Sequence, residues 1–576
     1  MMIDEISTSQ QRTAASERRG HCSLSLLVGG AAGSGIETIE KILADAFKAS
    51  GYYVFSSKEY MSRVRGGSNS TLMRISDTPV QAACWQVDMA IAIDGDALGH
   101  MKERFTEDTV VLAENAPEGK MPNLIDVAMK KEAKSFGSVR YANTYTAGFI
   151  FGLLRLDKEI LHASIDKYFK EDTDNIQIAD LGYDKGAGVT PGRLLTLPQS
   201  DKEATRKFHL MDGTAASGFG FLSGGCTMVT AYPMSPSTGV LNFMASCSKQ
   251  FTIAVEQSED EIASLNMVLG GWYAGARAMT TTSGGGFALM GEALSLSGMT
   301  ETPAVIYLAQ RPGPATGLPT RSEQGDLNMA IYSGHGPFER VVLAPGTLEE
   351  CIACGYLAFE LADRYQVPVI FLSDEYLADA IAMIGDIDFS SFKTGNYIIE
   401  SDKGYRRYAE AGDGISPRSV PGFGEGLVCA VSDEHDEAGQ ITEDHEMRVQ
   451  MVSKRARKRE MIGQSALLPK ISGEGSIAII GWGSTHGVIS EALSLLDDPR
   501  LCHIHFDWVH PLFKTQLETL EAYAYRVVVE NNADGLFADQ LKLHGIRIDE
   551  KVLQYNGFAF FADQLAQIIE SRVKEW

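Results

Sequence analysis

The chain has 576 residues, of which 44% are hydrophobic and 22% charged, and its formal net charge is −24. This composition is ordinary for globular protein, the length predicts three or more domains, and the negative charge argues against a nucleic-acid partner. No uninterrupted apolar stretch approaches the ~18 residues that a membrane-spanning helix needs, so we expect a cytoplasmic protein without membrane contact.

The chain begins with a polar, aperiodic segment over residues 1–22, for which we predict disorder. An apolar strand over 24–28 then leads through a glycine-rich turn containing Gly33 and Gly35 into an amphipathic helix. Glycines leave backbone N–H groups open to an anion at the start of the helix, so the segment is similar to a Rossmann-type phosphate loop. In a Rossmann fold an acidic residue further along the chain binds the ribose, and Lys58-Glu59 lies within the expected range. A charged residue is common at such a position, so this one does not identify a nucleotide site.

The next informative segment is Tyr232-Pro233-Met234-Ser235-Pro236-Ser237-Thr238. Proline fixes φ and forbids helix, so Ser235 is predicted to lie on a rigid turn at the end of a strand. Such turns carry functional groups in α/β folds. Taken alone, such a segment is usually an ordinary structural turn, since Pro and Ser are common turn residues.

A carboxylate, Glu261, opens a helix rich in small residues shortly after this turn, and a β-branched run then leads to Gly284, Gly285 and Gly286. A small-residue face lets a flat ring approach closely, and we expect the glycines to end the next strand in a loop without side chains. A glutamate at a helix start is often only a favourable charge near the dipole. The order and spacing of turn, glutamate, helix and glycines favour a functional site.

Further along the chain, residues 305–309 and 367–372 are predicted to be buried strands, and 348–364 a helix, as in a parallel doubly wound sheet. A charged stretch over 386–470 interrupts this rhythm. Its acidic cluster 433–437 is an alternative metal site, although such clusters are usually solvated surface. The final segment has a strand from 476, a helix from about 486 and a strand over 525–530.

Eight cysteines are scattered along the chain, and Cys351 and Cys354 form a CxxC inside a predicted helix. No set of four has the spacing of iron–sulfur ligands, so we interpret these two as buried small residues. Gly412-Asp413-Gly414 is not followed by a paired Asn at the spacing of a diphosphate-magnesium segment. We therefore expect no metal site in this chain.

Residues 206–385 resemble the alpha subunit of a 2-oxoacid:ferredoxin oxidoreductase, whose pyrimidine-binding domain carries a YPITPS-like turn and a glutamate-led helix. Met234 and Ser235 stand where the family usually has Ile and Thr, so the hydroxyl is kept. The segment 310–327, QRPGPATGLPTRSEQGDL, is similar to the 2-oxoglutarate branch. The first domain resembles the family's gamma domain, which closes over coenzyme A, and the last resembles a transketolase C-terminal domain.

The resemblance implies a multidomain α/β fold and a role for each matched residue. Glu261 would activate thiamine diphosphate, and Pro233, Gly284 and Gly285 would line its site. Tyr232 and Ser235 would bind the keto acid, with Arg311 near the reacting carboxylate and Arg321 near the distal one. The candidates for coenzyme A are Gly33, Gly35, Arg63 and Arg65. The implied domains are a tail (1–22), a gamma-type domain (23–195), a linker (196–207), the pyrimidine-binding domain (208–385), a connector (386–470) and a transketolase C-terminal-like domain (471–576).

The implied activity is thiamine diphosphate-dependent oxidative decarboxylation of 2-oxoglutarate to succinyl-coenzyme A with reduction of ferredoxin, or its CO2-fixing reverse in the reductive TCA cycle. A separate beta subunit would supply the diphosphate and Mg²⁺ site and a [4Fe–4S] cluster, within an (alpha-beta)2 heterotetramer. Two alternatives stay open. One is a branched-chain or aromatic 2-oxoacid enzyme, and the other a non-catalytic nucleotide-binding assembly subunit in which Glu261 is only a helix cap.

Overall fold

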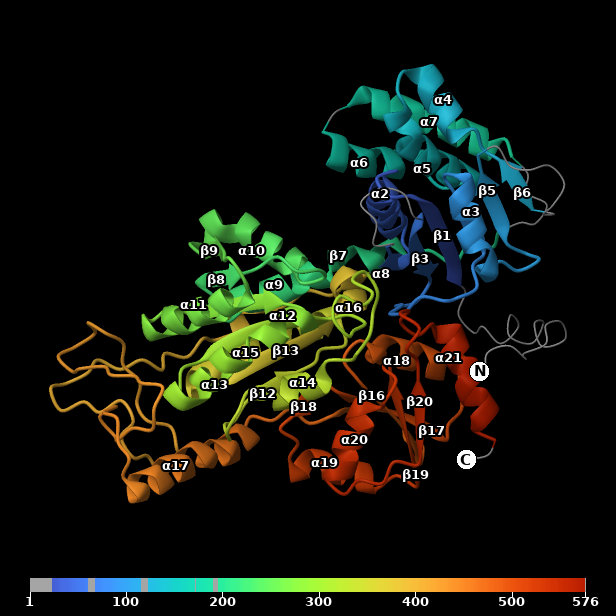
Figure 1. Cartoon of the computed structure of the whole chain (residues 1–576). Coiled ribbons are helices and arrows are strands. Elements are labelled where there is room, and N and C mark those ends of the chain that lie inside the picture. The colour runs from blue at the N-terminus through green and yellow to red at the C-terminus, as the bar shows by residue number, and fades with distance from the viewer. Residues whose placement is uncertain (1–22, 61–67, 115–122, 171, 190–194, 575–576) are drawn as a thin grey trace.

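The computed structural model describes residues 23–60, 68–114, 123–170, 172–189 and 195–574. These residues form three β-sheets with helices packed against them, which confirms the predicted multidomain α/β fold (Figure 1). The predicted tail 1–22 lies outside the described residues. Among the helices of the described segments, none combines the length and apolar character needed to span a bilayer.

The first sheet has eight strands in the order β6-β5-β4-β1-β3-β2-β14-β7. Strands β1, β4, β5 and β6 run parallel, whereas β3 pairs antiparallel with both β1 and β2. Two strands from much later in the chain, β7 and β14, extend one edge. The strands are β1 (Ser23–Ala31), β2 (Tyr53–Glu59), β3 (Ser68–Ser76), β4 (Met89–Ala92), β5 (Val110–Ala113), β6 (Leu124–Asp126), β7 (His209–Asp212) and β14 (Ile381–Ile384).

Helices that cover this sheet form the upper lobe in Figure 1. The glycine turn after β1 leads into α2 (Ile36–Ala49), as the amphipathic pattern predicts. The remaining helices here are α3 (Gly95–Met101), α4 (Met129–Phe136), α5 (Ala142–Leu153), α6 (Lys158–Phe169), α7 (Thr173–Ala187) and α8 (Lys202–Arg206).

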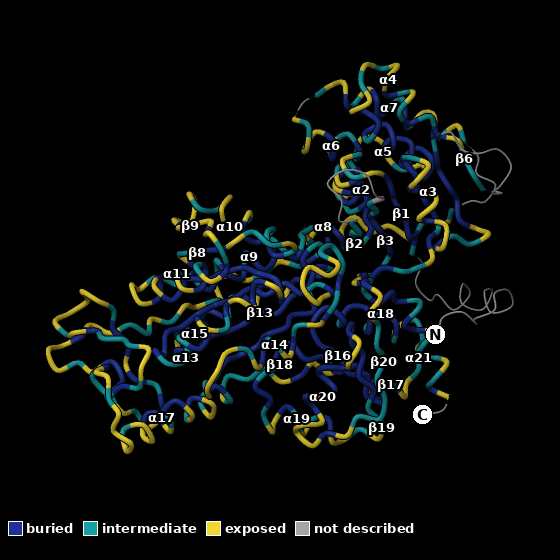
Figure 2. The backbone as a smooth tube through the Cα atoms, in the orientation of Figure 1, coloured by how far each residue is buried: buried dark blue, intermediate teal, exposed yellow. Residues whose placement is uncertain are grey.

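The second sheet has seven strands in the order β18-β12-β13-β11-β10-β8-β9, all parallel except β18 at one edge. Its central strands are buried along their whole length, as dark blue shows in Figure 2. Helices on both faces account for this burial. The strands are β8 (Met228–Ala231), β9 (Ala254–Gln257), β10 (Ala278–Thr282), β11 (Ala304–Gln310), β12 (Val341–Leu343), β13 (Pro368–Asp374) and β18 (Trp508–His510).

The helices of this layer agree closely with the periodic segments of the sequence. The predicted helix 348–364 is α15 (Leu348–Tyr365), and its Cys351 and Cys354 are buried as predicted. The others are α9 (Gly213–Ser223), α10 (Thr238–Phe251), α11 (Glu261–Tyr273), α12 (Gly284–Leu289), α13 (Gly291–Thr300), α14 (Leu327–Tyr332) and α16 (Glu375–Asp379).

Strand order in the second sheet creates a topological switch point at one defined place, where parallel α/β sheets form a ligand-binding crevice. From β8 the chain moves to β9 on one side, and it then returns to β10 on the other side of β8. The connections therefore diverge at the carboxyl ends of β8 and β10. In parallel α/β sheets such a switch point is where ligands bind.

The third sheet has five strands in the order β15-β17-β16-β19-β20, parallel except for β15. Its strands are β15 (Lys470–Ser472), β16 (Ile477–Trp482), β17 (Leu501–Phe506), β19 (Tyr525–Glu530) and β20 (Glu550–Leu553). Its helices are α18 (Thr485–Leu496), α19 (Lys514–Glu521), α20 (Leu536–Leu543) and α21 (Ala562–Arg572).

The connector between the second and third sheets extends away from the sheets in Figure 1 and ends in α17 (His445–Gly463). A buried ion cluster fixes this helix, because Lys454 and Lys458 each place Nζ 2.6 Å from a carboxylate oxygen of Glu301. Burial alone would raise the pKa of Glu301, but the two lysine charges outweigh it and hold the pKa below its usual range. The cluster therefore attaches the connector firmly to the end of α13.

Candidate active site

Three polar segments meet at the crevice because they follow adjacent parallel strands. The turn with Tyr232, Pro233 and Ser235 follows β8, the glycines follow β10, and Arg311 follows β11. The Arg311 guanidinium donates a hydrogen bond to the backbone carbonyl of Ser235 at 2.7 Å. The structure thus brings most of the proposed cofactor and substrate residues together at the carboxyl ends of neighbouring strands in the second sheet.

Glu261 is the first residue of α11, which begins beside this edge. The helix cap is the preceding residue, since the Asp260 side chain accepts a hydrogen bond from the N–H of Ala263 at 2.7 Å. Glu261 is therefore not needed as a cap, and its side chain turns inward. The residue is only 4% exposed, and its Oε1 is buried without a hydrogen-bond partner.

The glycines after β10 leave room for two carboxylates. A Cβ at Gly286 would lie 2.7 Å from Glu261 Oε1, and a Cβ at Gly284 would lie 2.5 Å from Asp326 Oδ2. The expectation of a loop at these glycines is wrong, because they open the short helix α12. Glycine permits the close approach in either case.

Asp326 is a site residue that the sequence reasoning missed. Its Oδ2 is buried without a hydrogen-bond partner, and its backbone N–H donates to Gln310 Oε1 at 3.0 Å. Burial raises the pKa of Asp326 to about 6, nearby Glu323 adds to the rise, and Arg311 opposes it. Burial lowers the pKa of Arg311, and the charge of Asp326 opposes that shift. The position of Asp326 in the motif 310–327 was the one available signal.

The turn after β8 presents its polar groups to the surface. Tyr232 and Ser235 are exposed, and Pro233 is partly buried between them. Ser237 is buried and donates its hydroxyl hydrogen to the carbonyl of Met234 at 2.7 Å. The hydroxyl of Ser237 therefore holds the turn, whereas the side chains of Tyr232 and Ser235 are free to meet a ligand.

The segment that carries Arg311 and Arg321 is fixed to the third sheet through Gln324, which the sequence reasoning also missed. The Gln324 backbone N–H donates to the Asn531 carbonyl at 2.7 Å, and the Asn531 N–H donates to Gln324 Oε1 at 2.9 Å. Nε2 of Gln324 donates to the Trp482 carbonyl at 2.8 Å. The same segment reaches the first lobe, since Thr320 Oγ1 donates to the Tyr60 carbonyl at 3.0 Å. The segment therefore contacts all three sheet domains.

Arg321 lies at this junction rather than on the strand end that holds Arg311. Its guanidinium carbon is 4.8 Å from the ring centre of Phe558, a cation–π contact. The positive charge of Arg321 acts to lower the pKa of Glu375. Burial has the larger effect and raises the pKa of Glu375 well above its usual range. Burial thus favours the neutral form of Glu375, which competes only weakly for the guanidinium.

The coenzyme A candidates lie in the first lobe. Gly33 and Gly35 adopt φ values of 81° and 83° in the turn between β1 and α2. The side chain of Asn143 occupies the space beside Gly35, where a Cβ would come within 1.8 Å of its Nδ2. Arg63 and Arg65 lie outside the described residues.

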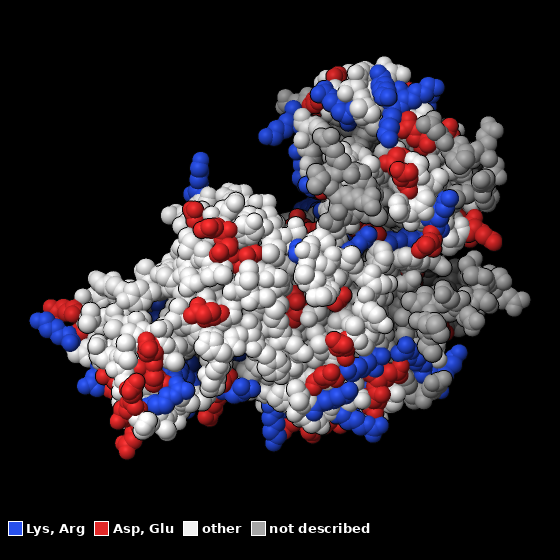
Figure 3. All heavy atoms as spheres, in the orientation of Figure 1, with Lys and Arg blue, Asp and Glu red and all other residues white. Residues whose placement is uncertain are grey.

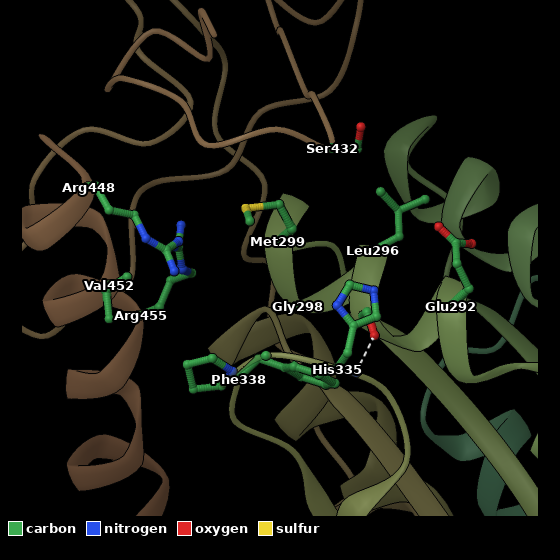
Figure 4. Close-up of a pocket in the computed structure, with 13 residues that line it drawn as sticks. Glu292, Leu296, Gly298, Met299, His335, Phe338, Ser432, Arg448, Val452 and Arg455 are labelled. Atoms are coloured by element: carbon green, nitrogen blue, oxygen red, sulfur yellow. Dashed lines mark hydrogen bonds between the residues drawn. The ribbon is translucent and has the colours of Figure 1, made fainter. Parts of the chain in front are cut away.

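A separate pocket of about 240 Å³ lies between α13 and α17, away from the crevice (Figure 4). Its Arg455 forms hydrogen bonds of 2.9 and 3.0 Å with Glu434, which also pairs with Arg448. The reading of cluster 433–437 as solvated surface is wrong for two members. Glu434 is held by arginines, and His435 is buried against Tyr408 with ring centres 3.9 Å apart.

Family models match the two parts of the chain described above. Residues 220–454 match the thiamine diphosphate-binding domain of pyruvate flavodoxin/ferredoxin oxidoreductases, and residues 25–185 match the pyruvate ferredoxin/flavodoxin oxidoreductase family. The fold and these matches define a thiamine diphosphate-binding oxidoreductase subunit.

Individual relatives narrow this class. The 2-oxoacid:ferredoxin oxidoreductase subunit alpha of Saccharolobus solfataricus is 30% identical over 96% of this chain and 98% of its own. The 2-oxoglutarate synthase subunit KorA of Archaeoglobus fulgidus is 30% identical over 64% of this chain and 100% of its own. The chain belongs to the family of 2-oxoacid:ferredoxin oxidoreductase alpha subunits.

A solved structure agrees over nearly the whole chain. The 2-oxoglutarate:ferredoxin oxidoreductase of Magnetococcus marinus, with 2-oxoglutarate, coenzyme A and succinyl-CoA bound, superposes with a TM-score of 0.90 at 27% identity. The match covers 96% of this chain and 99% of that one.

Replacing Gly286 by Ala is expected to displace both the Thr282 hydroxyl and the Glu261 side chain, because the new Cβ would lie 2.2 Å from Thr282 Oγ1 and 2.6 Å from Glu261 Cγ. We expect 2-oxoacid-dependent viologen reduction to fall about 10- to 100-fold, the cost of a lost charged hydrogen bond. The matched control is Gly270→Ala on α11, where no atom lies within 4 Å. Equal rates in both variants would contradict the assigned geometry.

Asp326→Asn is expected to stabilise the protein at high pH only. The folded pKa of about 6 exceeds the ordinary 3.8, so the carboxyl favours folding below pH 4 and loses that contribution as pH rises through 6. We expect a gain of up to about 3 kcal/mol at pH 8 that disappears near pH 4, measured by thermal unfolding. Exposed Asp433→Asn should show no such pH-dependent difference.

Proposed function

We propose that this chain is the alpha subunit of a 2-oxoglutarate:ferredoxin oxidoreductase that acts with a separate beta subunit. The observation that carries the proposal is the buried, unpartnered carboxylate oxygen of Glu261 at the switch point of the second sheet. Leaving such an atom without a partner destabilises the fold, which points to a ligand that supplies the missing contact.

Thiamine diphosphate fits this position. Glu261 offers an acceptor for a ring N–H, and no atom lies closer than 4.0 Å to a Cβ placed at Gly285. Gly284, beside Asp326, and Pro233, on the turn after β8, are proposed to line the same site. When bound, the cofactor supplies the electron sink that a 2-oxoacid needs in order to lose CO2. The role of Glu261 is to hold and activate the pyrimidine ring, while the chain's other groups bind and orient the substrate.

Two arginines favour a substrate with two carboxylates. Among the described residues, neither Arg311 nor Arg321 is seen in an ion pair. Arg311 donates to the Ser235 carbonyl through one terminal nitrogen and keeps its other N–H groups for a carboxylate, and Arg321 stacks on Phe558 with its N–H groups in the plane of the fork. Arg311 lies beside the exposed Ser235 and Tyr232, which can hydrogen-bond the keto acid, and Arg321 would bind the distal carboxylate. The KorA relatives and the 2-oxoglutarate bound in the Magnetococcus marinus enzyme support this choice.

Coenzyme A is proposed as the acyl acceptor, approaching from the first lobe. The turn at Gly33 and Gly35 precedes α2, so its N–H groups and the helix dipole favour phosphate. Arg63 and Arg65 would add positive charge. The Thr320–Tyr60 contact links this lobe to the substrate segment, and coenzyme A is bound in the solved Magnetococcus marinus relative.

A beta subunit is proposed to cover the crevice and to contribute Mg²⁺, the diphosphate site and a [4Fe–4S] cluster that passes electrons to ferredoxin. Exposed apolar side chains surround the site, and Figure 3 shows broad uncharged areas on this face. Such surface marks a protein interface. The exposed residues concerned are Tyr232, Ile262, Leu289, Leu318 and Tyr332.

We also propose an (alpha-beta)2 assembly and the domain division 23–195, 208–385 and 471–576, joined by the linker 196–207 and the connector 386–470. Strands cross these boundaries, since β7 and β14 complete the first sheet and β18 the second. The Gly412-Asp413-Gly414 segment packs on α17, since a Cβ at Gly414 would lie 2.3 Å from the Lys454 carbonyl. It therefore does not reach the crevice as a diphosphate segment would.

The alternative of a non-catalytic assembly subunit required Glu261 to be a helix cap. Asp260 caps the helix instead, so the helix does not need Glu261 as its cap, and this argument for the alternative falls away. The branched-chain or aromatic alternative differs only in having no use for Arg321, and substrate comparison separates it.

The proposed substrate is tested by viologen reduction with 2-oxoglutarate, pyruvate and 2-oxoisovalerate, using the complex with its partner, thiamine diphosphate and coenzyme A. We expect a clear preference for 2-oxoglutarate. Arg321→Leu should lower kcat/KM for 2-oxoglutarate about 10- to 100-fold, the value of a charged hydrogen bond, while sparing 2-oxoisovalerate.

Arg364→Leu is the matched control, since Arg364 is exposed on α15 and stacks on Tyr365 in a comparable cation–π contact. An unchanged 2-oxoglutarate rate in Arg321→Leu would refute the assignment of Arg321. A preference for another acid would keep the family and change the substrate.

A further inference from the structure

Three histidines converge in the third domain, on a different sheet from the crevice. His503 and His505 occupy alternate positions on β17 and therefore face the same side of the sheet. His486 lies in the first turn of α18, which packs over that side. Ligand nitrogens of the three rings all lie within 4.8 Å of one another.

One ring nitrogen of each histidine in this cluster lacks a hydrogen-bond partner. His503 is 3% exposed and His505 is 0% exposed, yet Nε2 of His503 and Nδ1 of His505 are buried without a hydrogen bond. Nδ1 of His486 is likewise without a hydrogen bond, with Glu350 Oε1 at 3.9 Å. Buried polar atoms are nearly always satisfied, so one unpartnered nitrogen on each of three neighbouring rings indicates a missing ligand.

The opposite nitrogens of two rings are held in the manner of metal ligands. His505 Nε2 lies 3.1 Å from Glu350 Oε2, and His503 Nδ1 lies 3.0 Å from Ser490 Oγ. A metal-bound histidine usually gives its other ring N–H to a carboxylate or another oxygen acceptor. With Nε2 of His505 engaged by Glu350, Nδ1 keeps the lone pair that a metal requires.

Charges near the cluster suit a cation. Lys470 is the basic residue next to the histidines, and it pairs with both Glu350 and Asp507, the latter at 3.0 Å. The two carboxylates exceed this one ammonium by one negative charge. Arg74, on the far wall, pairs with Glu491 at 2.7 Å. The local balance therefore favours a divalent cation over an anion.

Space for a further ligand is present. The histidines border a cavity of about 450 Å³ between the first and third sheets. Its other walls include Arg74 from β3 and Lys470 and Ser472 from β15. An ion held by the three rings would keep one position directed to this cavity, where water could bind.

We propose that His486, His503 and His505 form a binding site for a divalent transition-metal ion, best matched by Zn²⁺. Imidazole nitrogens are preferred Zn²⁺ ligands, and three of them plus water complete a tetrahedral set. Bond lengths of about 2.0–2.1 Å place ligand nitrogens about 3.4 Å apart, so the rings need to close only slightly on the ion. The site departs from the sequence-based expectation of no metal in this chain.

Because the ion would join α18 to β17 beside the first sheet, its binding should stabilise the contact between domains.

The test is Co²⁺ titration of the full-length chain with its partner subunit, after removal of metals with a chelator and return of excess Mg²⁺ to fill the proposed diphosphate site. Tetrahedral Co²⁺ gives a visible absorption band, recorded as the difference from the cobalt-free complex so that the absorption of the iron–sulfur cluster cancels, and Zn²⁺ should displace it. We expect the wild-type protein to bind one tetrahedral equivalent and Zn²⁺ to raise its melting temperature. His486→Gln should lower Co²⁺ affinity about 100-fold, and Ser490→Ala about tenfold.

The matched control is His445→Gln, which changes an exposed histidine on α17 and should leave the band intact. His486 is the chosen ligand variant because it is less buried than the strand histidines, so its replacement is the least disruptive to folding. Absence of the band in the wild-type protein, or an unchanged band in His486→Gln, would overturn the proposal.

Discussion

The proposed active site depends on one constraint: the carboxylate oxygen Oε1 of Glu261 is buried without a hydrogen-bond partner. Two neighbours make this possible. Asp260 caps α11, so Glu261 does not fold back onto the helix N–H groups, and Gly286 leaves the volume that the carboxylate occupies. Burying an acceptor without a hydrogen bond lowers the free energy of unfolding. Such atoms occur at binding sites, where the ligand supplies the missing hydrogen bond.

The position of the two arginines proposed to bind substrate, Arg311 and Arg321, depends on long-range contacts rather than on the segment that carries them. Gln324 fixes the segment to the third sheet, Thr320 fixes it to the first lobe, and Arg311 fixes its start to the turn at Ser235. Arg321 consequently lies where three domains meet. A change in the packing of any one of them would move the guanidinium.

Sequence patterns predicted the local structure well. The helix beginning at Glu261 and the strand before Arg311 follow from periodicity and flanking residues, and parallel pairing brings them together. The contact of Gln324 with Asn531 spans 207 positions, and no local signal marks it. The buried state of Asp326 and the pairing of β7 and β14 with the first sheet likewise depend on tertiary packing. The alternation of His503 and His505 was readable, but only the fold places His486 beside them.

The most direct measurement is ferredoxin or viologen reduction by Glu261→Gln in complex with its partner, compared with Glu259→Gln, an exposed neighbour outside the helix. The amide keeps the shape but cannot serve as a proton acceptor, so we expect activity to fall at least about 100-fold with the melting temperature and subunit association unchanged. Full activity in Glu261→Gln would contradict the account and favour an assembly role for the chain.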